Sequence, residues 1–155
     1  MIPATTTRVE QHTDGAINAR IRRQTERNIS HFAKQGDEDI GRRLEELDHE
    51  WDVERTLEAN AASISLLGLG LGAFVDRRFF LLPAVVAGFL LQHAVQGWCP
   101  PVPVFRRLGV RTAGEIDVER YALKAIRGDF NELRSERTHE MGDPEVTRVL
   151  EAVER

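Results

Sequence analysis

The sequence predicts an all-α protein built on a two-helix apolar hairpin of transmembrane length, with amphipathic helices on either side. Two apolar runs, 61–75 and 79–99, are separated by only Asp76, Arg77 and Arg78. The segments before and after them are charged and follow a helical period. No segment has a convincing strand pattern.

Charged side chains are concentrated in the two flanks of the 155-residue chain, a length that corresponds to one domain. Residues 1–59 carry 9 basic and 13 acidic side chains, residues 60–98 carry 2 and 1, and residues 99–155 carry 10 and 11. Nucleic-acid binding needs a one-sided basic surface, whereas both signs are mixed here. No nucleic-acid partner is therefore expected.

Residues 1–14 are rich in threonine and other polar residues without a period, so we expect them to lack order. They also lack a basic start followed by an apolar stretch, so no cleavable secretory signal is expected. Any insertion into a membrane would then be directed by the central apolar runs.

Residues 15–58 are expected to form two amphipathic helices that pack as an antiparallel pair. The large apolar residues of the first helix fall on one side, at Ile17, Ile21, Ile29 and Phe32. Gly36 accepts the left-handed conformation in which helices often end. Three acidic residues, 37–39, then suit the first turn of the second helix, where the helix dipole favours negative charge. The apolar residues of this helix follow at near-heptad steps, at Ile40, Leu44, Leu47, Trp51 and Leu57.

Residues 59–99 are expected to form the apolar helical hairpin. Nothing obvious breaks the preceding helix after Leu57, so it can continue into the first run as one rod. That run, 61–75, has 15 residues and a helical length of about 22 Å, against about 30 Å for the hydrocarbon core of a bilayer. Residues 57–60 extend it to nearly a full span. The second run is long enough by itself, with Pro83 marking its helical start.

Residues 100–155 begin with a proline-rich exit from the hairpin. The three prolines, at positions 100, 101 and 103, exclude a regular helix and predict an extended chain. C-terminal helices follow this exit.

Thr112 and Glu115 have the spacing of a capping box, which predicts a helix that ends near Gly128. Asp143 followed by Pro144 predicts the start of a last short helix. Aspartate caps helices, and proline suits the first helical position.

Aromatic and basic residues at one end of the hairpin favour a membrane location, because interfacial aromatics and a positive bias mark the cytoplasmic side. The candidate interface anchors at this end are Trp51, Trp98, Arg55, Arg106 and Arg107. The arginines near this end outnumber those of the turn, and they are Arg42, Arg43, Arg55, Arg106, Arg107 and Arg111. The bias predicts that both termini are cytoplasmic.

Small residues recur at four-residue steps in both runs. The candidates for close helix packing are Gly68 and Gly72 in the first run and Ala84 and Gly88 in the second. Such steps let helix backbones approach closely where lipid supplies no hydrophobic driving force. The expected partners are a lipid bilayer and further copies of the same chain.

A soluble arrangement remains open. The short first run and the polar trio Gln92, His93 and Gln96 count against a membrane span. An all-helical soluble oligomer that buries the same hairpin between charged helices or subunits would accept both features. The two interpretations share the antiparallel apolar helices and differ in what surrounds them.

Two side chains of the hairpin are candidates for reactivity or ligand binding, His93 and Cys99. A histidine inside an apolar run is a functional candidate, although it can also face a polar interface or a partner helix. A single cysteine excludes an intramolecular disulfide framework. Cys99 can be packed at the helix end or, with Arg106 or Arg107 near, act as a reactive thiol. A redox or sulfur-handling protein that uses Cys99 is therefore a third hypothesis.

No catalytic constellation is visible in the sequence, and we expect no enzymatic activity, cofactor, metal site or small-molecule substrate. Residues 68–73 fit the letters of a dinucleotide-binding fingerprint, but neither the crossover helix nor the later acidic residue accompanies them, so helix packing explains them better. Asp48, His49 and Asp52 could line one edge of a helix as metal ligands. The acidic residues of that stretch suit a solvated helix face better.

The glycine-containing apolar run, the short polar turn and the second run closing on GWCPP, followed by LGVRT, resemble the YgaP-like transmembrane domain family. The matching positions are Gly97, Cys99, Pro100, Leu108, Gly109 and Thr112. The similarity covers about residues 55–114.

This resemblance implies a self-associating hairpin in a bacterial inner membrane. Some members of the family carry a rhodanese, which transfers sulfur through a catalytic cysteine. The present chain shows no such domain, so sulfur transfer does not carry over. The leading expectation is a small, non-enzymatic inner-membrane protein that acts as a membrane anchor or an oligomeric interaction module.

Overall fold

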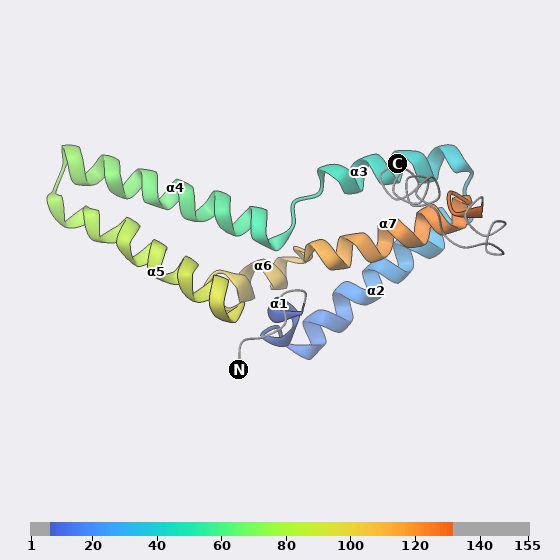
Figure 1. The fold of residues 1–155 in the computed structure, drawn as a ribbon, viewed down its shortest axis with the longest axis horizontal. Coiled ribbons are helices and arrows are strands. Elements are labelled where there is room, and N and C mark those ends of the chain that lie inside the picture. Colours follow the sequence, from blue (N-terminus) through green and yellow to red (C-terminus); the bar gives the residue numbers. More distant parts are fainter. Residues whose placement is uncertain (1–6, 132–155) are drawn as a thin grey trace, which may run out of the picture. The chain divides into compact units, whose positions relative to one another are not determined.

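A computed structural model describes residues 7–131, and all regular structure within that range is helical (Figure 1). The elements are α1 (Arg8–Gln11), α2 (Gly15–Phe32), α3 (Asp37–His49), α4 (Val53–Phe74), the 3-10 helix η1 (Arg77–Phe80), α5 (Leu81–Gln96), α6 (Val102–Leu108) and α7 (Ala113–Arg127). The all-α fold class is confirmed. The helix expected to start at residues 143–144 lies outside the described residues.

The described chain divides into two compact units. Residues 7–25 and 50–116 form the hairpin unit, which contains α1, α4, η1, α5 and α6. Residues 26–49 and 117–131 form the second unit, which contains α3. Helices α2 and α7 each contribute residues to both units.

Helices α4 and α5 lie antiparallel and in contact (Figure 1). The 22 residues of α4 span about 33 Å. The helix begins after Asp52, whose side chain accepts a hydrogen bond from the Arg55 N–H at 2.7 Å, as an N-cap does. In the turn, Asp76 accepts from the Arg78 N–H at 2.8 Å and so caps η1. Pro83 lies in the first turn of α5, close to the helical start that the sequence predicts.

Two of the four predicted small residues lie where α4 packs on η1 and α5. Gly68 and Gly72 are buried. A Cβ atom on Gly68 would lie 2.8 Å from Pro83 Cδ, and one on Gly72 would lie 2.7 Å from the Phe80 ring. Ala84 and Gly88 are exposed, and a Cβ on Gly88 would meet nothing within 4 Å. Close packing inside the hairpin therefore uses α4 glycines alone.

Gly68→Ala is expected to destabilise the hairpin by about 1–3 kcal/mol, because the new methyl group would overlap the rigid Pro83 ring. Gly70→Ala is the matched control, since nothing lies within 4 Å of its Cβ position. Alanine there should be neutral or stabilising by up to about 1 kcal/mol. Denaturant titration of both variants measures the difference. Equal stabilities would contradict the close approach at Gly68.

Helix α3 and helix α4 are separated by a break at residues 50–52. The expectation of one unbroken helix from residue 37 through Trp51 and Leu57 is therefore wrong. The expectation that the helix continues from Leu57 into the apolar run is confirmed for α4. Tertiary contacts hold the break. The Val53 N–H donates to the Arg111 carbonyl at 2.9 Å, and the Arg111 guanidinium donates to the Glu50 carboxylate at 2.6 and 2.7 Å.

The expectation that residues 1–14 lack order is wrong for residues 8–11, which form α1. Val9 is buried against the hairpin, and the Asn18 side-chain amide donates to the Glu10 carbonyl at 2.9 Å. A single apolar residue in a polar stretch shows no period, so the sequence pattern could not reveal this contact. Residues 1–6 lie outside the described part of the chain.

The expectation of an extended, proline-blocked exit is also wrong, because the prolines stand at the start of α6. Pro101 is the N-cap residue of α6, and Pro103 lies in its first turn. Backbone N–H groups in the first turn have no partner inside the helix, so proline costs nothing there. The chain therefore re-enters a helix within a few residues of leaving α5.

Helix α7 begins with the predicted capping box. The Thr112 N–H donates to Glu115 Oε2 at 2.8 Å, and the Glu115 N–H donates to Thr112 Oγ1 at 3.2 Å. The helix ends at Arg127, and Gly128 has a φ of 93°, which glycine tolerates. Both predicted ends of this helix are confirmed.

The second unit is held together by apolar and polar burial. Its buried apolar residues include Ile40, Leu44, Leu47 and Leu123. The carboxylate of Glu119, on α7, is fully buried and accepts from Arg43 Nε at 2.8 Å and from the Asn28 amide at 3.2 Å. Because Arg43 lies on α3 and Asn28 on α2, the Glu119 carboxylate joins α7 to both of these helices.

Candidate functional site

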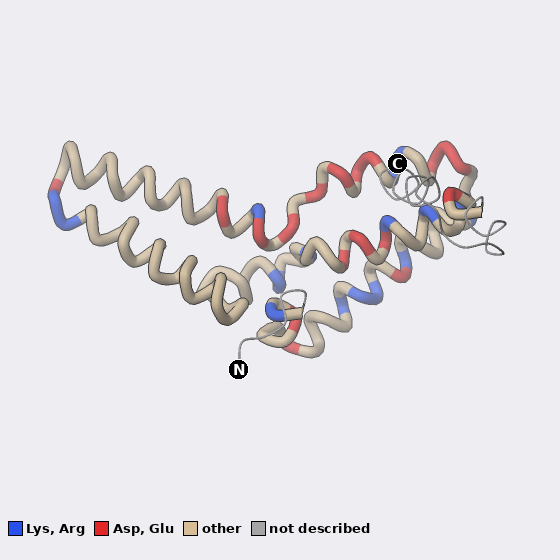
Figure 2. Tube along the Cα trace, in the orientation of Figure 1, with Lys and Arg blue, Asp and Glu red and all other residues tan. Residues whose placement is uncertain are grey.

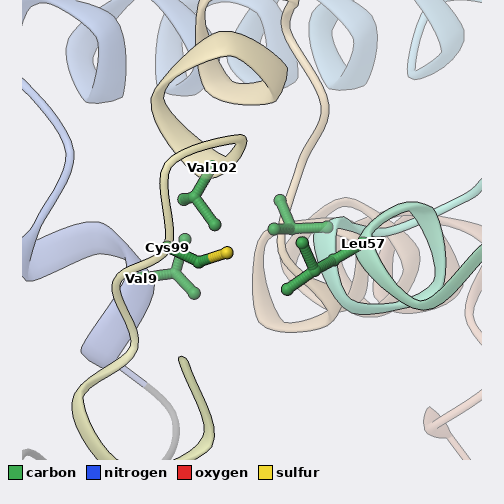
Figure 3. Packing of buried hydrophobic residues seen from close by; sticks show 5 residues of the cluster. Val9, Leu57, Cys99 and Val102 are labelled. Atoms are coloured by element: carbon green, nitrogen blue, oxygen red, sulfur yellow. The ribbon is translucent and has the colours of Figure 1, made fainter. Parts of the chain in front are cut away.

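The end of the hairpin opposite the turn is closed by a small apolar cluster, the hairpin base (Figure 3). Its buried members are Val9, Val53, Leu57, Cys99 and Val102. They come from α1, α4, α6 and the segment between α5 and α6. Both candidate residues of the sequence, His93 and Cys99, lie near this end of the hairpin.

Cys99 is a packed core residue. Its side chain points toward Leu57 in Figure 3, with Val9 beside it, and the residue is 2% exposed. Burial raises the pKa of the Cys99 thiol, which keeps it in the unreactive, protonated form. This geometry favours the packing role over the reactive-thiol role.

Maleimide is expected to label Cys99 in the native protein at pH 7 about a hundredfold more slowly than in the unfolded chain, because labelling requires local opening. Ala113→Cys in a Cys99→Ser background is the control, because Ala113 is exposed. Its thiol should react at nearly the unfolded rate. Rapid labelling of native Cys99 would contradict the packing role and revive the redox hypothesis.

His93 is 3% exposed, and it pairs with Glu54 across the hairpin. His93 Nε2 lies 2.8 Å from Glu54 Oε2, and Arg8 Nη2 donates to Glu54 Oε1 at 3.0 Å. Arg8 Nη1 also donates to the Ala94 carbonyl at 3.1 Å. His93 Nδ1 is buried without a hydrogen-bond partner among the described residues. One carboxylate therefore holds together three elements, α1, α4 and α5.

The sequence pattern does not reveal Glu54 as the partner of His93. The two residues are 39 positions apart, so neither a motif nor a helical period links them. Depth along the hairpin does not link them either. Counted from the turn at residues 76–78, Glu54 and His93 differ in depth by about two helical turns.

Arg106 is not an interface anchor, because its guanidinium is fully buried. Its two terminal nitrogens donate to the two Glu115 carboxylate oxygens at 2.6 and 2.7 Å. They also donate to the Val110 carbonyl at 3.0 Å and to Asn18 Oδ1 at 2.9 Å. The residue joins α2, α6 and α7 inside the hairpin unit and is unavailable to a membrane surface.

Burial of Glu115 tends to raise the pKa of its carboxyl group, but hydrogen bonds from Arg106 and Thr112 outweigh burial, so the pKa lies below its ordinary value. A lowered pKa stabilises the fold at pH values above the unfolded pKa, about 4.3, and the stabilisation is lost as pH falls through the folded pKa. We therefore expect stability to fall with acid below about pH 4.5, and Glu115→Gln to weaken that dependence. Unfolding curves between pH 7 and pH 3 measure it, and identical acid slopes in both proteins would contradict it.

The other predicted anchors remain at the surface. Trp51 is exposed, and the Arg55 guanidinium lies 4.5 Å from the centroid of its ring, a cation–π contact. Arg107 is exposed and Trp98 is partly buried. Trp51 precedes α4 and Trp98 follows α5, so both flank the hairpin end opposite the turn, as the sequence predicts.

No group of three or more metal-ligating side chains occurs within residues 7–131. The weak metal candidates have other contacts: Asp48 pairs with Arg120, and Asp52 caps α4. Residues 68–73 are continuous helix, with Gly68 and Gly72 packed on η1 and α5, and so form no phosphate-binding turn.

The dominant feature of the hairpin is its exposed apolar surface. The large exposed apolar residues of this region are Leu66, Leu67, Leu69, Phe74, Val75, Phe79, Phe80, Leu81, Val85, Phe89, Leu91 and Val95. Two stretches, Asp37–Phe74, whose apolar part lies in α4, and Arg77–Gln96, are long and apolar enough to cross a membrane by length and composition. Only 6% of the apolar part of the second stretch is buried. Figure 2 shows charge at the turn and at the opposite end, with none along the helices between.

Comparison of the chain with protein-family models, with curated proteins and with solved structures finds no match.

Proposed function

We propose that the chain is a small, non-enzymatic protein of the bacterial inner membrane. Its hairpin anchors it in the bilayer, where the protein acts as an oligomeric interaction module. The observation that carries the proposal is the exposed apolar surface of α4, η1 and α5. Monomeric proteins in water rarely leave so large a contiguous apolar surface uncovered. Lipid is an environment in which such a surface is stable.

The charge pattern supports complete crossing of the bilayer. Residues 59–75 and 79–96 carry no aspartate, glutamate, lysine or arginine, and 17 residues of α-helix span about 25 Å. The turn between them exposes Asp76, Arg77 and Arg78. Because charged groups are costly in hydrocarbon, the turn belongs on the far side of the bilayer.

Side chains at the opposite end support a cytoplasmic location for both termini. Trp51 and Arg55 form an exposed stacked pair directly before the charge-free part of α4, where interfacial residues are expected. Arg107 is exposed as well. Arg106 and Arg111 are engaged by Glu115 and Glu50, so they add less to the positive-inside bias than the sequence alone suggests.

The resemblance of residues 55–114 to the YgaP-like transmembrane domain family supports the same location. Self-association in the membrane would use the outer face of α5. Ala84 and Gly88 are exposed there and take no part in the contact with α4, so they are free to let a second copy approach closely. The expected assembly is a homo-oligomer in lipid.

Detergent-free fractionation tests the location. The protein should sediment with membranes and resist alkaline carbonate extraction. Recovery in the high-speed supernatant, followed by sizing as an oligomer, would contradict the membrane proposal and favour a soluble assembly that buries the hairpin between subunits.

Cysteine labelling tests the orientation. In a Cys99→Ser background, Arg78→Cys should react with an impermeant maleimide added outside intact spheroplasts. Ala113→Cys should react only after lysis, because it lies on the side of the termini. The opposite pattern would reverse the proposed topology.

A further inference from the structure

Helix α7 has apolar residues on two sides. Leu123 lies on the side that faces the second unit and is 0% exposed. On the opposite side, Val118 is 61% exposed and Tyr121 is 41% exposed. We define the outer face of α7 by four residues of the second unit that lie within about 100° around the helix axis: Val118, Tyr121, Ala122 and Ala125. A helix side that faces water is normally polar, so this face is expected to be covered.

The chain beyond residue 131 contains an apolar pattern of the same design. Residues 132–155 lie outside the part of the chain that the structure describes, and the sequence predicts a helix there from Asp143 and Pro144. The apolar residues of that stretch stand at i, i+3, i+4 and i+7, which places them on one side of a helix. They are Val146, Val149, Leu150 and Val153. The outer face of α7 has the identical spacing, so the two faces match in length and pattern.

We propose that residues 143–155 form a helix that packs antiparallel against the outer face of α7 of the same chain. Because both apolar faces follow the same spacing, one antiparallel register aligns all four positions. Its pairs are Ala125 with Val146, Ala122 with Val149, Tyr121 with Leu150, and Val118 with Val153. The two alanines of α7 leave room for the larger valines opposite them.

The connection between the two helices is long enough for this return. Gly128 follows the end of α7 with a φ of 93°, and its N–H donates to the Lys124 and Ala125 carbonyls at 3.1 and 3.3 Å. The Asp129 N–H donates to the Lys124 carbonyl at 3.1 Å, which completes a Schellman motif and stops the helix. Residues 129–142 can then span up to about 45 Å, whereas α7 is about 22 Å long.

The charges of α7 favour the antiparallel direction. Residues 120–127 carry three basic and no acidic side chains, and residues 113–119 carry three acidic and no basic ones. An antiparallel helix places its first turn, with Asp143 and Glu145, beside the basic half of α7. A parallel helix would place that turn beside the acidic half. Complementary charge across a contact fixes its orientation and register.

The tether favours this segment over any other occupant of the outer face. A short flexible connection gives an effective concentration in the millimolar range, which a second copy of the chain would have to exceed. Docking also removes two apolar faces from water at once. The residues of the outer face belong to the second unit, so the proposal does not depend on what surrounds the hairpin.

Disulfide cross-linking of the full-length protein tests the register, in mild detergent or in buffer as fractionation dictates. Two variants both carry Cys99→Ser and Ala125→Cys. One adds Val146→Cys and the other adds Val153→Cys, and copper phenanthroline serves as the oxidant. Position 153 lies about 10 Å further along a helix than position 146. Because a disulfide needs Cα atoms within about 7 Å, the first variant should form an intrachain disulfide at least about tenfold faster than the second.

Charge substitutions in the first variant test the apolar contact. Leu150→Glu places a charge inside the contact and should slow the cross-link about tenfold. Thr147→Glu is the matched control, because the helical period places Thr147 off the apolar side, and it should leave the rate unchanged.

Three results would overturn the proposal. The first is a cross-link in the Val153→Cys variant that is as fast as, or faster than, that in the Val146→Cys variant. The second is an undiminished rate with Leu150→Glu. The third is a disulfide that joins two chains, because it would show that a second copy covers the outer face of α7.

Discussion

Arg106→Met is expected to lower the free energy of unfolding by about 3 kcal/mol, because it leaves the partly buried Glu115 carboxylate without its counter-ion. The Arg106 guanidinium is fully buried, with two hydrogen bonds to Glu115 and one each to Asn18 and Val110. Removing it leaves acceptors unpaired on α2, on α7 and in the segment between α6 and α7. Denaturant unfolding of the full-length protein, followed by circular dichroism, measures the loss.

Arg107→Met is the matched control for this substitution. It changes the same residue type one position along α6, but Arg107 is exposed. A surface change of this kind usually alters stability by less than about 0.5 kcal/mol. Similar losses in the two variants would mean that the buried ion pair with Glu115 does not form.

Val85→Lys is expected to reduce membrane insertion of the hairpin by about 2.5–3.5 kcal/mol in apparent free energy, if lipid surrounds α5 as we propose. Val85 lies near the middle of the stretch Arg77–Gln96 and is 53% exposed. In water, lysine at such a position would be harmless, because it displaces no internal contact. The fraction of newly made protein that resists carbonate extraction measures the effect.

Val118→Lys is the matched control for the insertion experiment. Val118 is as exposed as Val85 but lies on α7, outside the charge-free segments. Its substitution should leave the extractable fraction unchanged. A Val85→Lys protein that inserts as well as Val118→Lys would show that the outer face of α5 does not lie in lipid.

Features that depend on neighbouring residues could be predicted from the sequence. The capping box at Thr112 and Glu115, the acidic first turn of α3 and the turn at Asp76 each involve residues within one helical turn. The two apolar helices α4 and α5 could be predicted from composition alone. Gly68 and Gly72 were found because helix packing needs small residues at that spacing.

Features that depend on distant residues could not be predicted. The break before α4 is held by the backbone and side chain of Arg111, and the pairing of His93 with Glu54 joins residues from two arms of the hairpin. Arg106 was assigned to the membrane surface because its sequence neighbours are basic, whereas its partner Glu115 lies on another helix. Helical periodicity predicts which face of a helix a residue lies on, but it does not predict which residue of another element contacts it.

The charged turn of the hairpin would lengthen the residence time of the protein in a bilayer. Arg77 and Arg78 are both exposed beside Asp76. Each guanidinium costs about 2.5–3.5 kcal/mol at the bilayer centre, and the turn must pass that point on the way out as well as on the way in. Exchange between the bilayer and the cytosol would then be slow. If the hairpin spans the bilayer as we propose, the protein would stay in the membrane permanently, and its insertion would require the translocation machinery of the cell.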